Sequence, residues 1–181
     1  MATTKSLQQG SSTVEFALVA ALLLTLLFGI MESGRVFLVW NAAQEVTRRA
    51  ARNAAILGFG FTPFIQYDAV LNPEATSGTI AFPGIGEITN WTVSIQFMTG
   101  TFGALTATSS PPASAAINRS NCTQGLNPCV KAVQATLCVP GSDPCQPVSY
   151  LPTALPGTSL QLFLPVSSVT LPLESAGASP G

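Results

Sequence analysis

The feature that most constrains this chain is the stretch from Gly10 to Leu57, which contains no proline and no turn cluster. Its apolar run over residues 16–31 carries no charge and would span roughly 24 Å as a helix, against ~30 Å for a bilayer's hydrocarbon core. Apolar residues resume over 36–40 and end at Trp40, which suits a membrane–water interface. The rest of the stretch is charged and Ala-rich. We therefore predict one long helix that begins in a membrane and emerges into water.

The charge of the chain excludes several functions. Only 8% of its 181 residues are charged, against about 25% in an average soluble domain, and the net charge of −1 gives no electrostatic case for nucleic acid. The absence of His removes the commonest general base and the commonest zinc ligand. The carboxylates after the helix are widely spaced, at Asp68, Glu74, Glu87, Asp143 and Glu174. We therefore predict a protein that is not an enzyme, with no cofactor, metal site, nucleic-acid partner or small-molecule substrate.

The start of the apolar run carries a processing pattern. Gly10 is followed five residues later by Glu15 and then Phe16, which resembles the site that prepilin peptidase cuts. Cleavage after Gly10 would free the amine of Ser11. A carboxylate in lipid is costly unless paired, and in pilin-like families it is thought to pair with the new amine of a neighbouring subunit. A secretory signal peptide fits less well, because only Lys5 precedes the run and no A-x-A follows it. An ordinary membrane anchor remains an open alternative.

The same stretch resembles the TadE family of minor pseudopilins from tight-adherence (Flp) pilus systems, over about the first third of the chain. The matching residues are Gly10, Glu15-Phe16-Ala17, the Leu-rich run, Gly29 with Glu32-Ser33-Gly34-Arg35, and Arg48-Arg49-Ala50-Ala51-Arg52. The resemblance implies a single-pass anchor in the bacterial inner membrane, an exported C-terminal domain and a part in type IV (Flp/Tad) pilus assembly. It implies membrane lipid, prepilin peptidase and other pilin-like subunits or Tad assembly proteins as partners. The alternative is a membrane-anchored binding module of the cell envelope with no pilus role.

Two faces of the predicted helix have distinct patterns. A row of small side chains at every fourth position would let another helix approach closely, unless such residues are simply frequent in membrane helices: Ala17, Ala21, Thr25, Gly29 and Ser33. Glu32 and Arg35 stand three residues apart and can pair. Beyond Trp40, an apolar stripe is predicted to dock the exported domain: Val39, Ala43, Val46, Ala50, Ala54 and Leu57.

The four cysteines, Cys122, Cys129, Cys138 and Cys145, predict two disulfides in an oxidising compartment. Residues 128–138 read either as a helix that starts at Asn127-Pro128 or as an alternating strand. In both cases Cys129 and Cys138 lie too far apart to pair with each other. The two C-x6-C spacings favour 122–129 with 138–145, and the pairing of 122–138 with 129–145 remains the alternative.

The remaining pattern predicts an α+β, pilin-like architecture: a long N-terminal transmembrane helix continuing into a small disulfide-containing antiparallel β-sheet domain. We expect a leader at 1–10, the helix at 11–57, the exported domain at 58–174 and a disordered tail at 175–181. The strongest strand covers residues 91–98, with Trp91, Val93, Ile95 and Phe97 facing the core and Thr92, Ser94 and Gln96 facing out.

Other parts of the exported domain have weaker signals. Residues 59–90 read as loop with short elements, including a strand at 78–82, and residues 100–120 read as loop. Residues 159–173 read as strand interrupted by Pro165, at an edge or a bulge.

The orientation in the membrane receives opposing signals. The count of Lys and Arg favours a cytoplasmic C-terminal side. Lys5 precedes the apolar run, whereas four arginines follow it: Arg35, Arg48, Arg49 and Arg52. The cysteines and the leader favour export of the C-terminal domain, and we adopt that orientation.

Overall fold

A computed structural model describes residues 9–101, 103–142, 144–152 and 162–173 of the chain. The predicted leader, apart from its last two residues, and the predicted tail at 175–181 lie outside these residues. The described chain divides into two compact units, which meet in sequence between Leu38 and Val39.

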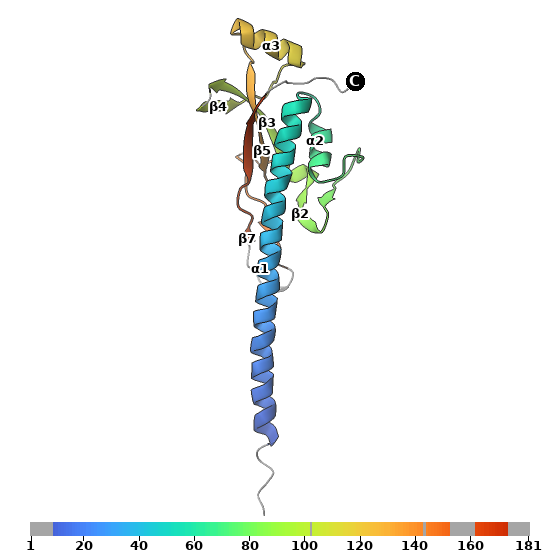
Figure 1. Cartoon of the computed structure of the whole chain (residues 1–181), viewed down its shortest axis with the longest axis vertical. Helices are drawn as coiled ribbons and strands as arrows, with labels where there is room; N and C mark the ends of the chain where they lie inside the picture. Colours follow the sequence, from blue (N-terminus) through green and yellow to red (C-terminus); the bar gives the residue numbers. More distant parts are fainter. Residues whose placement is uncertain (1–8, 102, 143, 153–161, 174–181) are drawn as a thin grey trace, which may run out of the picture. The chain divides into compact units, whose positions relative to one another are not determined.

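Helix α1 (Gln9–Leu57) is a single α-helix of 49 residues (Figure 1). It confirms the helix predicted over 11–57. Its part in the first unit is apolar and mostly exposed. The helix is long and apolar enough to cross a membrane, with a mean hydropathy of 2.4 over an 18-residue window. Arg35 Nη1 lies 4.0 Å from Glu32 Oε1, which confirms the predicted pair.

The C-terminal part of α1 belongs to the second unit and carries the predicted docking stripe. Val39, Ala43, Val46, Ala50 and Ala54 are all at most 1% exposed, and Leu57 is half-buried, so the stripe is confirmed. The helix ends at Gly58, whose N–H donates to the Ala54 carbonyl at 3.1 Å. The φ of Gly58 is 73°, a left-handed conformation that glycine adopts without the steric cost a Cβ would bring.

The centre of the second unit is a four-stranded antiparallel sheet in the order β4-β3-β5-β8. The strands are β3 (Val93–Thr101), β4 (Ala104–Ala107), β5 (Val130–Leu137) and β8 (Ser168–Pro172). On one face the apolar residues stand opposite each other, as in the pairs Val93↔Leu137 and Phe97↔Val133, and all four of these side chains are buried. This sheet, the long helix and two disulfides confirm the predicted α+β class.

Smaller elements complete the second unit. They are α2 (Thr62–Ala69), the hairpin of β1 (Ala81–Phe82) and β2 (Ile85–Thr89), the 3-10 helix η1 (Asn90–Thr92), α3 (Ala115–Gln124), and the pair β6 (Ser149–Tyr150) and β7 (Leu162–Phe163). Specific contacts join the C-terminal part of α1 and the residues after it to the rest of this unit. Thr47 Oγ1 lies 2.8 Å from Ser167 Oγ, Asn53 Nδ2 donates to Asp68 Oδ2, and the ring centroids of Phe59 and Phe97 are 4.9 Å apart.

Residues 59–90 contain short elements, as predicted, whereas the continuous loop predicted at 100–120 is wrong. The first contains α2 and the β1–β2 hairpin, so the strand predicted over 78–82 shrinks to its last two residues. The second contains β4 and the first part of α3. These elements are short and begin among Pro, Gly and Ser, so local composition suggested loop. Burial of Ile65, Ala69 and Val70 stabilises α2, a tertiary effect that local propensity does not contain.

The predicted strand at 91–98 begins two residues late. Trp91 is 54% exposed and Thr92 is buried, the reverse of the prediction. The cause is η1, where Thr92 Oγ1 accepts from the Thr89 N–H at 3.0 Å and donates to the Thr89 carbonyl at 2.7 Å. Val93 and Phe97 face the core as predicted, while Ile95 is half-buried.

Residues 130–137 form a strand, so the helical reading of 128–138 is wrong and the strand alternative is confirmed. β5 pairs with β3 on one side and with β8 on the other, and these partners satisfy its backbone groups. Pro165 lies between β7 and β8 rather than inside a strand, and residues 159–161 of the predicted strand lie outside the described residues.

Truncation of Val46 tests the docking stripe. We expect Val46→Ala to lower the free energy of unfolding by about 2 kcal/mol, because two buried methyl groups are lost and a cavity remains. Ile56→Ala is the matched control: it removes more atoms from the same helix, but Ile56 is 49% exposed, so the loss stays below about 1 kcal/mol. Urea unfolding of the full chain in detergent micelles measures both, and equal losses would contradict the burial of the stripe.

Candidate membrane and assembly site

The residues predicted for processing and pairing lie in the first turns of α1. The backbone of Gly10 and Ser11 is helical, and Glu15 and Phe16 follow about one turn later, with Phe16 74% exposed. The rise of the helix separates Ser11 from Glu15 by about 6 Å along its axis. An amine created at Ser11 would therefore lie within a turn of a carboxylate, at the positive end of the helix dipole, where a carboxylate is stabilised.

The predicted row of small residues forms one exposed face of α1. Its two hydroxyls bond within the helix: Thr25 Oγ1 donates to the Ala21 carbonyl, and Ser33 Oγ donates to the Gly29 carbonyl at 2.8 Å. A Cβ added at Gly29 would meet nothing within 4 Å. The row is therefore open to a partner, and its hydroxyls need no water or lipid to satisfy them.

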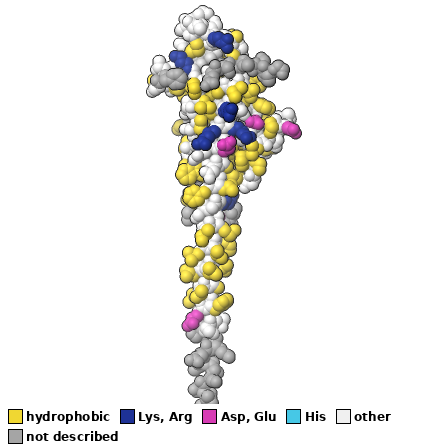
Figure 2. Space-filling model, viewed as in Figure 1, with side chains coloured by type: hydrophobic (Ala, Val, Ile, Leu, Met, Phe, Trp, Pro, Cys, Tyr) yellow, Lys and Arg dark blue, Asp and Glu magenta, His cyan; other side chains and the backbone are white. Residues whose placement is uncertain are grey.

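The two halves of α1 differ in the side chains they carry. Figure 2 shows hydrophobic side chains along the N-terminal half and Lys and Arg side chains over the C-terminal half. The exposed apolar residues include a row of large side chains beside the small ones: Leu18, Leu22, Leu26 and Ile30. The cations of this half are Arg35, Arg48, Arg49 and Arg52. This division suits a helix that passes from hydrocarbon into water.

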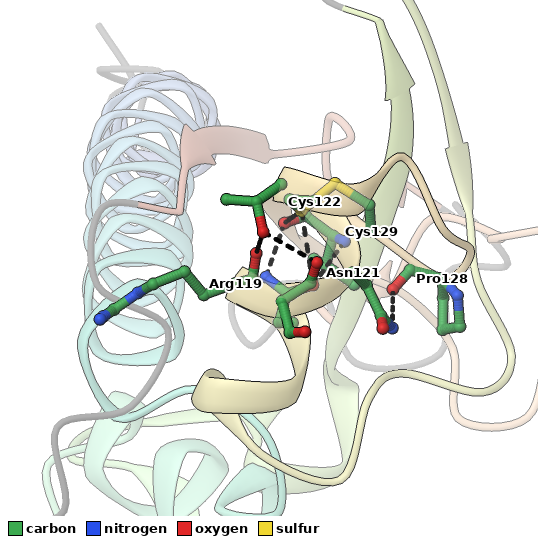
Figure 3. The surroundings of a disulfide bond; sticks show 9 residues. Arg119, Asn121, Cys122, Pro128 and Cys129 are labelled. Atoms are coloured by element: carbon green, nitrogen blue, oxygen red, sulfur yellow. Dashed lines mark hydrogen bonds between the residues drawn. A yellow bond between two sulfur atoms is a disulfide. The ribbon is translucent and has the colours of Figure 1, made fainter.

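The cysteines form two disulfides, Cys122–Cys129 and Cys138–Cys145, with Cα–Cα distances of 4.9 and 5.2 Å. The favoured pairing is confirmed and the 122–138 with 129–145 alternative is wrong. Figure 3 shows the first bond joining the end of α3 to the segment before β5. Asn121 supports this join, because its Nδ2 donates to the Pro128 carbonyl at 2.9 Å. Each bond closes a short loop, which stabilises a small domain by restricting its unfolded chain.

Two buried asparagines, to which the sequence pattern assigned no role, position loops of the second unit. Asn118 Nδ2 donates to the Val130 carbonyl at 2.9 Å, and its Oδ1 accepts from the Val130 N–H at 2.8 Å. Asn90 Oδ1 accepts from the Ile80 N–H at 2.8 Å. Both residues are at most 5% exposed. No local pattern distinguishes them from surface asparagines, because their backbone partners are ten or more residues away in the chain.

Within the described ranges, no three His, Cys, Asp or Glu side chains converge as a metal site would require. The features that the structure does assemble are an apolar exposed helix, a helix face of small residues, and a domain fixed to the other end of the same helix.

These features define a class: a domain carried on an N-terminal helix that is a candidate membrane anchor. The family model described as TadE-like protein matches residues 10–52. The N-terminal part of this chain is therefore TadE-like, which confirms the predicted resemblance from Gly10 to Arg52. No curated protein and no solved structure is significantly similar to the chain.

The role of the small-residue row in helix association stays a prediction, which Gly29→Leu tests. We expect association of full chains in a bilayer to fall about fivefold, because the added side chain would separate the two backbones. Ile30→Leu, on the next residue of the helix, should leave association unchanged. Energy transfer between labelled chains measures both variants. If Gly29→Leu inserts into the bilayer and associates as strongly as the unsubstituted chain, this face is excluded as the contact.

Proposed function

We propose that the chain is a TadE-like minor pseudopilin, a membrane-anchored structural component of a type IV (Flp/Tad) pilus assembly system. The observation that carries the proposal is the family match over residues 10–52, which includes Gly10, Glu15 and the apolar run. The proposed role is structural rather than catalytic. Its proposed partners are membrane lipid, prepilin peptidase and other pilin-like subunits or Tad assembly proteins.

In this proposal one helix performs two tasks. Its N-terminal part holds the chain in the membrane, offers the Gly10–Ser11 bond to the peptidase, and presents Glu15 and Phe16 to a neighbouring subunit. Its C-terminal part carries the exported domain on a buried stripe of Ala and Val side chains.

We place the protein in the bacterial inner membrane as a single-pass protein, with the domain after Val39 outside the cytoplasm. The support for this side is chemical, because both disulfides lie in that domain and disulfides persist in oxidising compartments.

The second candidate function is a membrane-anchored binding module of the cell envelope with no pilus role. The observation behind it is that the docking stripe and the small-residue row would serve any anchored domain. The two candidates differ in what they require of Gly10 and Glu15.

The N-terminus of the protein purified from a host that contains prepilin peptidase tests the processing step. We expect mass spectrometry to find Ser11 as the first residue, because cleavage after Gly10 removes the leader. Gly10→Val should retain the leader, since its side chain blocks close approach to the backbone. Retention of residues 1–10 in the unsubstituted chain would contradict the pseudopilin proposal.

Substitution of Glu15 tests the assembly step. We expect Glu15→Ala and the isosteric Glu15→Gln to reduce recovery of pilus-protein complexes roughly tenfold or more, because a charge-assisted contact in an apolar setting is lost. Membrane insertion should survive in both variants, and Val14→Ala should behave like the unsubstituted chain. Co-purification from membranes measures assembly, and carbonate extraction measures insertion. Unchanged assembly with Glu15→Ala would favour the binding-module alternative.

A further inference from the structure

A groove of about 340 Å³ opens on the second unit between α1 and the connection from β7 to β8. Helix α1 lines it with Trp40, Gln44 and Arg48, and the connection lines it with residues 165–169. Along α1 the lining changes from aromatic to amide to cation over about 12 Å. No feature of the proposed function accounts for this groove.

The groove is preformed, because hydrogen bonds fix its two walls to each other. Thr47 Oγ1 and Ser167 Oγ, both buried, are 2.8 Å apart and join α1 to the connection. The Leu137 N–H also donates to the Ser167 carbonyl at 3.1 Å, which ties the connection to the end of β5. Val166, next to this fixed point, has a side chain that is 55% exposed.

The lining of the groove begins close in sequence to the candidate membrane span. Trp40 follows Leu38, the last residue of the apolar first unit, by two positions on the same helix. Trp40 is 41% exposed, and it shares the groove with Val166. Exposed apolar side chains continue into β7, at Leu162 and Phe163. Trp prefers the membrane–water interface. Val166 lines the same groove as Trp40, so it lies at the level of α1 where we expect that interface.

Arg48 supplies the polar part of the groove. It is exposed, and within the described residues no carboxylate oxygen lies within 4.0 Å of its guanidinium group. Helical side chains lean toward the helix N-terminus, so Arg48 can extend toward Gln44 and Trp40. A guanidinium group is the side chain best suited to bind a phosphate through two parallel hydrogen bonds.

We propose that this groove binds the headgroup and glycerol end of a phospholipid from the bilayer around α1. The phosphate lies against Arg48 and Gln44, and the start of the acyl chains lies against Trp40 and Val166. This order matches the sequence of layers in a bilayer interface, where phosphate lies outside the acyl chains. The exported domain is thereby seated on the membrane surface. The inference rests on the proposed membrane anchoring and adds a lipid site outside the spanning segment.

Depth-dependent fluorescence quenching tests the apolar part of the site. Val166→Trp is introduced into the full chain with Trp40→Phe and Trp91→Phe, and the protein is reconstituted into phosphatidylcholine vesicles brominated near the top of the acyl chains. We expect the introduced side chain to be quenched at least threefold more than Trp91 in the Trp40→Phe chain. Trp91 is the matched control, because it is 54% exposed in the same unit but does not line the groove.

The outcomes separate this inference from the proposed function. A chain that floats with the vesicles while its introduced tryptophan is quenched no more than Trp91 overturns the lipid site and leaves membrane anchoring intact. If neither brominated lipid nor aqueous acrylamide quenches the introduced tryptophan, a protein segment occupies the groove. That outcome also overturns the proposal. A chain that does not float overturns anchoring and the lipid site together.

The phosphate contact has its own test with Arg48→Gln. Native mass spectrometry of the full chain released from phospholipid vesicles should find bound phospholipid on the unsubstituted chain and at least fivefold less on Arg48→Gln. Arg52→Gln is the control, because Arg52 is exposed one turn further along α1 and does not line the groove. Equal retention by the two variants, or no retained phospholipid on the unsubstituted chain, overturns the contact with phosphate.

Discussion

The burial of one face of α1 is the interaction on which the second unit depends. The side chains of this face are almost all Ala, Val or Thr, and the small ones let the helix backbone approach its neighbours closely. Hydrogen bonds at Thr47 and Asn53 then join the helix to the β7–β8 connection and to α2. The sheet contributes its own buried side chains to this unit, because Val93 and Phe97 of β3 and Val133 of β5 are all buried.

The same helix meets a different requirement in its first unit. There most side chains are apolar and exposed, and the ion pair within the described residues of that unit joins Glu32 to Arg35 on one helix face. Pairing lowers the cost of placing two charges near lipid. An α-helix suits both environments, since it satisfies its backbone hydrogen bonds internally whether the surroundings are lipid or protein.

The second unit is small and poor in charge, so its order depends on a few specific constraints. Two disulfides each close a short loop, at the end of α3 and after β5. Asn118 and Asn90 satisfy buried backbone groups that regular strands leave unpaired. Such groups are costly to bury without a partner, so these side chains restrict the loops to one arrangement.

Long and repeated patterns were predictable, and short elements were not. The C-terminal end of α1 and its buried stripe followed from the sequence because both depend on spacing along one element. The two C-x6-C spacings favoured the observed disulfide pairing but left one alternative open. Trp91 was placed in the core by alternation, but the hydrogen bonds of Thr92 turn the chain into a 3-10 helix at that point. Helix α2 was missed, since its stability comes from the burial of Ile65 and Ala69 rather than from propensity.

The sequence by itself determined the candidate membrane helix, the TadE-like segment and the face on which the domain docks, because hydrophobic periodicity and residue spacing act locally. Only the tertiary structure decided that residues 130–137 form a strand, because that choice depends on hydrogen bonds to β3 and β8 from distant parts of the chain. It also decided that Trp40, Arg48 and Val166 share one groove. Val166 lies more than a hundred residues from the helix in sequence, so only folding could bring them together.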